Sequence, residues 1–242
     1  MVKIDLITGF LGSGKTTFIK KYAKYLMAQG MNIGILENDF GAVNVDMMLL
    51  KDLEGEQCEL EMVAGGCDAD CHRRRFKTKL IAMGMCGYDR VIVEPSGIFD
   101  VDEFFDVLRE EPLDQWYEIG SVITIMNAKL EDTLSEEAEY LLASEAANAG
   151  CVVLSRSQDA SPEEIAKTRA HLNCALQAVH CSRQFGDEII EKNWEDFTEQ
   201  DLERIQNSGY HVEDYTKLHF PEKEGFQSVC VMNQEMTRQE LK

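Results

Sequence analysis

The sequence predicts a three-layer α/β fold with a mostly parallel central sheet, and two features lead to that prediction. Short, apolar, β-branched runs alternate with longer helical patterns, which is the order expected when strands and helices follow one another. A glycine-rich loop directly follows the first of these runs and opens the first helical pattern. This arrangement is typical of the P-loop class of α/β folds.

Five runs are predicted to be strands that are buried on both faces of the sheet. Each run is short and rich in β-branched residues, and polar or turn-forming residues bound it. The predicted strands cover residues 2–8, 31–39, 89–96, 120–127 and 151–157.

Helical patterns lie between and after these runs. One pattern ends at Gly30, and another opens with Ser161 and Pro162, a common start signal. Because strands and helices alternate, we expect helices on both faces of the sheet. The predicted helices cover residues 14–30, 100–112, 134–150, 161–176 and 193–209.

The chain is predicted to contain one domain and the start of another. Residues 1–216 are expected to form a P-loop nucleotide-binding domain, because one α/β core accounts for the elements described above. Residues 217–242 give a turn, a strand and a helix start that stops at the chain end. We interpret them as the beginning of a truncated C-terminal domain.

Charge and composition exclude several function classes. The net charge of −20 would repel nucleic-acid phosphates and anionic lipids, so neither is an expected partner. No apolar run approaches the roughly 20 residues of a membrane-spanning helix, and the N-terminus lacks a cleavage signal. The eight cysteines lack the spacing of a secreted disulfide framework. We therefore expect a cytoplasmic protein.

The stretch GFLGSGKTT, residues 9–17, carries the clearest chemistry in the chain. It fits Gly-x-x-x-x-Gly-Lys-Thr, in which glycines let backbone N–H groups surround phosphate oxygens. Lys15 is expected to reach the β- and γ-phosphates, and the Thr16 hydroxyl is expected to bind Mg²⁺. The predicted nucleotide contacts in this loop are Gly9, Gly12, Ser13, Gly14, Lys15, Thr16 and Thr17.

Carboxylates follow two of the predicted strands. ILENDFG ends the second strand with Glu37 and Asp39, and VIVEPSG ends another with Glu94 and then Gly97. A Mg²⁺–nucleotide site needs such groups at the carboxyl ends of neighbouring strands. These residues are therefore candidate Mg²⁺ and phosphate-sensing groups.

Together these stretches resemble the CobW/HypB/UreG family of P-loop GTPases, and the CobW branch in particular. The resemblance is carried by GFLGSGKTT, ENDFGAVNVD, GGC ahead of a second cysteine, and EPSG, and more weakly by TIMNA and GCVVLSRS. LHFPEKEGFQSVCV looks like the opening of that branch's small C-terminal domain.

The resemblance implies a function and roles for individual residues. Members of the family are nucleotide hydrolases that deliver metals or activate metal- and corrinoid-dependent enzymes. It implies catalytic roles for Lys15, for Asp39 as the switch carboxylate, and for Glu94 with Gly97 as the turn that senses the γ-phosphate. The implied ligands are GTP or ATP and Mg²⁺. The implied partners are a client metalloprotein or corrinoid enzyme and, when nucleotide is bound, a second copy of the chain.

The base-recognition loop departs from the family's Asn-Lys-x-Asp pattern. Ser155, Arg156, Ser157 and Gln158 replace the motif, and Gln158 offers one acceptor oxygen where aspartate offers two. Asp159 would supply the missing carboxylate if the loop shifted by one residue. We favour GTP on the resemblance and keep ATP as the alternative.

The segment GGCDADCHRRR departs from the family's Cys-x-Cys-Cys. Its spacing is Cys67-x-x-x-Cys71, and two thiolates supply half of a tetrahedral shell for zinc or another transition metal. Glu37 is a candidate for a further metal ligand. His72 is a weaker candidate, because on a helix its side chain points about 100° away from that of Cys71. Two other interpretations stay open, a free cysteine pair and a redox-active pair beside the following arginines.

Two other function classes compete with a metallochaperone GTPase. One is a nucleotide-gated adaptor for a metalloenzyme that carries no metal of its own. The other is a small-molecule P-loop kinase, which is disfavoured because the late part of the chain has only isolated arginines instead of an arginine-rich lid. The basic run 73–75 with Lys77 and Lys79 is interpreted as a solvated helix face. The alternatives are a surface for an acidic partner and an arginine directed at phosphate across a dimer.

Overall fold

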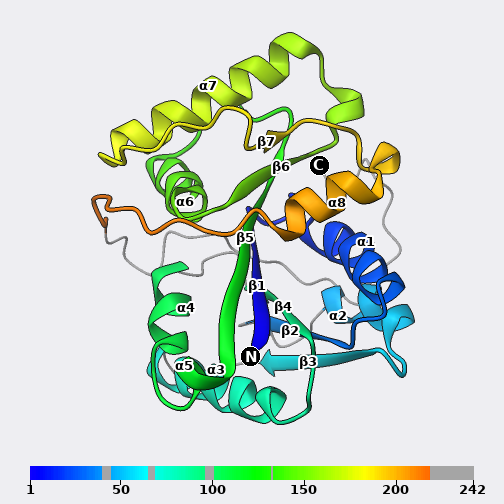
Figure 1. Ribbon diagram of the computed structural model, residues 1–242. Helices are drawn as coiled ribbons and strands as arrows, with labels where there is room; N and C mark the ends of the chain where they lie inside the picture. Colours follow the sequence, from blue (N-terminus) through cyan, green and yellow to red (C-terminus); the bar gives the residue numbers. More distant parts are fainter. Residues whose placement is uncertain (40–44, 65–68, 96–100, 132, 219–242) are drawn as a thin grey trace, which may run out of the picture.

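The computed structural model describes residues 1–39, 45–64, 69–95, 101–131 and 133–218, which form a three-layer α/β fold (Figure 1). In these residues seven strands form one sheet in the order β3-β2-β4-β1-β5-β6-β7, and every neighbouring pair is parallel. The predicted fold class is confirmed. The strands are β1 (Val2–Thr8), β2 (Ile33–Asp39), β3 (Cys58–Ala64), β4 (Arg90–Pro95), β5 (Tyr117–Asn127), β6 (Cys151–Ser155) and β7 (Ile189–Ile190).

Helices cover both faces of this sheet, as the alternating pattern predicts. One hydrophobic core lies under α1 (Lys15–Ala28), α2 (Val45–Leu50) and α8 (Glu199–Gln206). The other core lies under α3 (Ala69–Gly84), α4 (Val101–Leu108), α5 (Leu113–Trp116), α6 (Glu136–Ala147) and α7 (Pro162–Ala178). Figure 1 shows the sheet between these two layers.

The buried strands divide their side chains between the two cores. On β1, Ile4 and Leu6 join the core under α3–α7, whereas Ile7 joins the core under α1. Because successive strand residues point to opposite faces, such a strand must be apolar along most of its length. The five predicted strands satisfy this condition, and each coincides with an observed strand.

Two observed strands, β3 and β7, were not predicted. β3 lies at one edge of the sheet, where Glu59 and Glu61 alternate with Cys58 and Leu60. An edge strand with one polar face lacks the continuous apolar run on which the prediction relied. β7 has two residues, which is too short for any periodicity to appear.

The single helix predicted over 193–209 is wrong in its extent. A short 3₁₀ turn spans Trp194–Asp196, and α8 begins only after Thr198. The Thr198 side chain accepts from the backbone N–H of Asp201, and the Asp201 carboxylate accepts from the backbone N–H of Thr198. This capping box sets the helix start, since both side chains satisfy backbone donors that a longer helix would not leave free.

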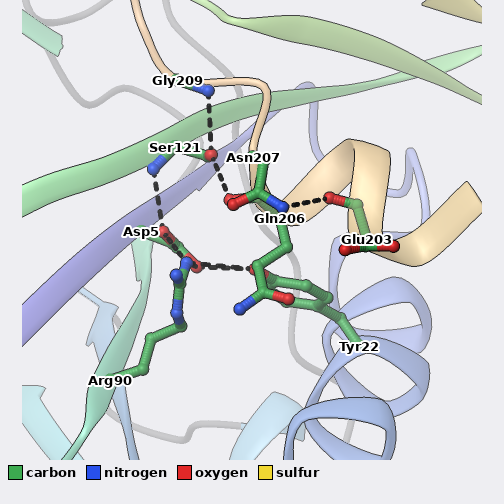
Figure 2. Close-up of polar contacts among 8 residues, drawn as sticks. All are labelled: Asp5, Tyr22, Arg90, Ser121, Glu203, Gln206, Asn207 and Gly209. Atoms are coloured by element: carbon green, nitrogen blue, oxygen red, sulfur yellow. Dashed lines mark hydrogen bonds and ion pairs between the residues drawn. The ribbon is translucent and has the colours of Figure 1, made fainter. Parts of the chain in front are cut away.

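A buried ion pair connects strands and helices below the site (Figure 2). Arg90 Nη1 of β4 donates to both carboxylate oxygens of Asp5 on β1, at 2.6 and 2.7 Å. The Tyr22 hydroxyl of α1 donates to Asp5 at 2.8 Å, and the Ser121 N–H of β5 donates at 2.8 Å. The Ser121 hydroxyl in turn donates to the carbonyl oxygen of Gln206, the last residue of α8. The network therefore fixes α1 and α8 to the centre of the sheet.

The carboxyl ends of β1, β2 and β4 position the functional site. α1 follows β1 on one face of the sheet, while α6 follows the neighbouring strand β5 on the other, so the chain diverges to both sides between β1 and β5. Ligands bind in α/β sheets at such a divergence. Among the described helices, none is both long and apolar enough to cross a membrane.

Candidate nucleotide site

The loop between β1 and α1 has the backbone that a phosphate cradle needs. Gly9, Gly12 and Gly14 have φ of 136°, 75° and 102°, values that side chains other than glycine rarely allow. A Cβ on Gly9 would lie 2.2 Å from the carbonyl oxygen of Ile125, so even alanine would displace β5. The glycines of the predicted motif are therefore needed for this loop to close against the sheet.

Lys15 and Thr16 lie at the end of β4. Lys15 is buried, and its Nζ donates to the carbonyl oxygen of Gly9 at 2.9 Å. Nζ also lies 3.9 Å from Oε1 of Glu94, and the Thr16 hydroxyl donates to the same oxygen at 3.4 Å. A buried ammonium group, a hydroxyl and a carboxylate thus converge at the carboxyl edge of the sheet.

A second carboxylate lies beside Glu94. Glu37 on β2 is its Cα partner in the parallel ladder, so both side chains leave the sheet on the same face. Both are buried, on the face that α1 covers. Carboxylate and hydroxyl oxygens are the protein ligands that Mg²⁺ prefers, so Glu94, Glu37 and Thr16 fit the predicted ion. Asp39 ends β2, but its side chain lies outside the described part, as does all of Gly97.

The first turn of α1 leaves donors for an anion. Gly14 caps the helix without a side-chain hydrogen bond, so nothing from the cap residue occupies the first N–H groups. Ser13 is buried, and its hydroxyl oxygen has no hydrogen-bond partner among the described residues. Thr17 is exposed on the same turn. Because helix N-termini attract anions, this geometry fits the phosphates of a nucleotide.

The predicted base loop lies beside the phosphate loop. Ser155 ends β6, and its Cβ would lie 3.7 Å from a Cβ on Gly14. Arg156 has a left-handed backbone, with φ of 55°, and its guanidinium donates to the carbonyl oxygen of Gly12 at 3.4 Å. Gln158 and Asp159 follow on an exposed 3₁₀ turn, where the Gln158 amide donates to the Asp159 carboxylate at 3.5 Å. The two candidate base-reading side chains, Gln158 and Asp159, are therefore in contact.

Trp194 is a site residue that the sequence analysis missed. Its ring lies 3.2 Å from where a Cβ on Gly14 would be, and it packs edge-on against Phe18 of α1. Its Nε1 donates to the carbonyl oxygen of Leu154 at 2.8 Å. The Trp194 ring therefore packs against the phosphate loop on the side of β6. Its position in a stretch mistaken for helix hid this role.

Glu145 of α6 is a second missed residue. Its carboxyl group is buried against the phosphate loop, where the Gly9 N–H donates to it. Burial raises the pKa of Glu145 to about 8, although the Lys15 charge and the Gly9 hydrogen bond lower it. A signal was available in the sequence, because a glutamate stands among alanines in the apolar stretch ASEAANA.

The predicted cysteine pair is only half described. Cys67 lies outside the described residues, and Cys71 is half-buried on the first turns of α3. With Arg74 and Arg75, Cys71 lines a groove of about 490 Å³ between α3 and β3. Within the described part of the chain, no three His, Cys, Asp or Glu side chains form a group that could hold a metal ion. The metal site with Cys67, Cys71 and Glu37 remains a prediction.

The basic residues of α3 are largely occupied within the chain. Arg73 and Lys77 both pair with Glu110, after α4, at 2.6 and 2.5 Å. Lys79 pairs with Glu61 on β3 at 2.7 Å. The two cations hold the pKa of the Glu110 carboxyl below its usual range. These ion pairs connect α3 to β3 and to the segment after α4. The sequence analysis did not predict them.

A glycine loop between strand and helix, with its lysine and threonine beside a strand-end glutamate, defines the class of P-loop nucleotide-binding proteins. Residues 3–184 match the model of the CobW/HypB/UreG nucleotide-binding domain, and the chain belongs to this family of P-loop GTPases. The resemblance found in the sequence is thereby confirmed, including the CobW-type branch.

Curated relatives cover most of this chain with only part of their own length. The zinc chaperone YeiR of Escherichia coli is 28% identical over 167 residues, which are 67% of this chain and 49% of that protein. The zinc chaperone CobW of Pseudomonas aeruginosa is 23% identical over 214 residues, covering 74% of this chain and 56% of that protein. The chain thus spans about half the length of these relatives.

Solved structures agree on the fold. The hydrogenase maturation factor HypB from Archaeoglobus fulgidus superposes with a TM-score of 0.52 at 16% identity, covering 84% of this chain and 86% of that one. The signal recognition particle receptor FtsY from Elizabethkingia anophelis, in complex with GDP, gives 0.51 at 15% identity, covering 86% and 64%. At such low identity these likenesses show the fold alone.

Proposed function

We propose that this chain binds Mg²⁺ and a nucleoside triphosphate, hydrolyses the nucleotide, and uses the nucleotide state to control metal delivery to a client protein. GTP is favoured over ATP because the family consists of P-loop GTPases. One observation carries the proposal. Lys15 and Thr16 converge on Glu94 below the open first turn of α1, with Glu37 beside it.

The described residues account for the chemistry by positioning and charge. The loop N–H groups and Lys15 bind the phosphates, and Thr16 holds Mg²⁺ together with strand-end carboxylates, of which Glu94, Glu37 and Asp39 are the candidates. When bound, Mg²⁺ would supply positive charge opposite the negative charge that develops on the transferred phosphoryl group. Glu94 is also the proposed group that orients the attacking water, since its carboxylate lies 3.9 Å from Lys15 Nζ and accepts from the Thr16 hydroxyl. Phosphoryl transfer needs no covalent step from the protein.

Zinc is the proposed cargo. The relatives described above are named zinc chaperones, and Cys67 and Cys71, which offer two thiolates, stand in the sequence between the strands that end with Glu37 and Glu94. Glu37 is the proposed third ligand. A client metalloprotein and a nucleotide-dependent pairing of two copies complete the proposal, as do domain limits of 1–216 and 217–242.

Replacing Lys15 tests the hydrolase. Lys15→Ala removes the ammonium from the phosphates, so we expect release of inorganic phosphate from GTP to fall about a hundredfold or more. Lys24→Ala is the matched control, because Lys24 is an exposed lysine on the same helix. Equal rates in the two variants would contradict the proposal. Free phosphate formed without an acceptor also separates the hydrolase from the kinase alternative.

Zinc titration with and without GTP and Mg²⁺ tests the cargo. We expect Cys67→Ala and Cys71→Ala each to weaken zinc binding at least tenfold and to abolish any effect of nucleotide on it. Cys86→Ala is the control, because Cys86 is exposed and follows the end of α3, whereas Cys71 lies at its start. Unchanged zinc affinity in both variants would overturn the cargo and favour the nucleotide-gated adaptor. Ala69 and Asp70, standing where family members have cysteines, are the observation that keeps this second candidate.

A further inference from the structure

Glu145 holds the phosphate loop from below, in a contact that the phosphate-binding role alone does not explain. Its side chain is 4% exposed at the last turn of α6, and its carboxyl group accepts the Gly9 N–H. The Thr124 hydroxyl of β5 donates to its carbonyl oxygen at 2.9 Å, which fixes the backbone as well. A buried carboxyl group therefore rests on the first glycine of the loop.

Gly9 is held from both sides. Its N–H reaches Glu145, and its carbonyl oxygen accepts from Lys15 Nζ at 2.9 Å. Because a phosphate oxygen is a stronger partner for an ammonium group than a neutral carbonyl, bound nucleotide would draw Nζ away from Gly9. The same event brings several negative charges to the loop. Both changes disfavour a negative charge on Glu145.

The charges around Glu145 come from three directions. Lys15 faces it from the phosphate loop, and its charge is the one that stabilises the carboxylate. Glu145 also lines a cavity of about 300 Å³, whose other charged residues are Lys129 and Glu131 after β5 and Arg156 after β6. Arg156 and Glu131 are exposed, so water screens their effect on the buried carboxyl group.

We infer that Glu145 is a positioning residue for the phosphate loop, and that nucleotide binding is coupled to uptake of one proton by its carboxyl group. The proton comes from solvent, and the Gly9 N–H contact is kept because a protonated carboxyl group still offers an acceptor oxygen. This inference rests on the proposed nucleotide binding. Affinity should then be highest when Glu145 is already neutral and should fall as pH rises.

The direction in which nucleotide affinity changes with pH follows from the linkage between proton binding and nucleotide binding. Burial already places the pKa of Glu145 at about 8 in the free protein, and nucleotide raises it further. Binding therefore takes up protons between those two pKa values, and affinity is lost as pH rises above about 8. One group contributes at most tenfold per pH unit, so we expect about a tenfold weaker nucleotide affinity at pH 9 than at pH 7.

Calorimetric titration of the full chain with GDP, in buffers of different ionisation enthalpy, tests the coupling without any substitution. We expect uptake of about half a proton per nucleotide at pH 8 and less at pH 7, because the free group is half ionised near its pKa. Zero proton uptake at pH 8 would overturn the inference. Absence of nucleotide binding at every pH would overturn the proposed function, and the inference with it.

Variants assign the proton to Glu145. Glu145→Gln keeps an acceptor for Gly9 but cannot titrate, so its affinity should change less than twofold between pH 7 and pH 9. Glu136→Gln, an exposed glutamate at the start of the same helix, should keep the wild-type pH profile. Glu145→Leu also removes the acceptor and should bind about tenfold more weakly than Glu145→Gln at pH 7. A wild-type profile in Glu145→Gln would contradict the assignment.

Discussion

At the scale of single residues, the site is built from groups whose ordinary chemistry is changed by where they lie. Lys15 is buried on backbone carbonyl oxygens, Glu94 faces both Lys15 and Thr16, and Glu145 is enclosed below the loop. Each placement is costly without a partner, because buried charges need one. Lys15 and Glu94 offset each other in part, with 3.9 Å between Nζ and Oε1, and the proposed phosphates would add a second partner for Lys15.

Base preference should depend on Gln158. Gln158→Asp adds a second acceptor oxygen for the guanine edge, so we expect the ratio of ATP to GTP dissociation constants to rise about tenfold. Asp159→Asn is the companion variant, because it should lower the same ratio if Asp159 already supplies the carboxylate. Competition against a fluorescent nucleotide measures both. No change in either variant would mean that another part of the chain reads the base.

Glu145 should also make the free energy of unfolding depend on pH when no nucleotide is bound. Its pKa is raised from the ordinary 4.5 to about 8 on folding, so its contribution is fully present below about 4.5 and is lost as pH rises to about 8. Relative to Glu145→Gln, the wild-type free energy of unfolding should fall by about 1.4 kcal/mol per pH unit in this window. Urea unfolding at pH 6, 7 and 8 measures it. Parallel curves for the two proteins would contradict the pKa.

At the scale of elements, the sheet and two helices depend on a polar contact inside an apolar core. The Asp5–Arg90 pair joins β1 and β4, while Tyr22 and Ser121 extend it to α1 and to the end of α8 (Figure 2). Arg90 is 3% exposed, so water cannot replace its partner. Such a pair fixes the register of the elements that share it.

Breaking this pair should be strongly destabilising. Arg90→Met leaves Asp5 buried without its counter-charge, so we expect a loss of about 3–5 kcal/mol in the free energy of unfolding. Arg109→Met is the control, because the Arg109–Asp106 pair is exposed and should contribute less than about 1 kcal/mol. Denaturant unfolding compares them. If Asp5→Leu combined with Arg90→Met were no more stable than Arg90→Met alone, the uncompensated charge would not be the cause.

At the scale of the whole molecule, the net charge of −20 opposes compaction. Local pairs such as Arg73–Glu110 relieve only part of it. Sodium chloride screens the remaining repulsion, since the Debye length falls from about 30 Å at 0.01 M to about 10 Å at 0.1 M. We therefore expect the Tm to rise by a few degrees over this range. Differential scanning calorimetry measures it, and a lower Tm would show that ion pairs outweigh repulsion.

The sequence by itself determined the fold class, the five doubly buried strands and the phosphate loop. These follow from local patterns: apolar runs that only a covered sheet can bury, and glycines directly before Lys15 and Thr16. The edge strand β3 was not predicted because half of its side chains face water, so it lacks a continuous apolar run. The start of α8 escaped because the Thr198 capping box interrupts a continuous helical pattern.

Only the tertiary structure decided which residues of the site meet. Glu37 and Glu94 are 57 positions apart and become neighbours because β2 and β4 pair in one register. Trp194 and Glu145 reach the loop from opposite sides, from a turn after β7 and from the end of α6. The physical reason is that local propensity acts over a few residues, whereas burial and charge pairing act between segments that only the folded sheet brings together.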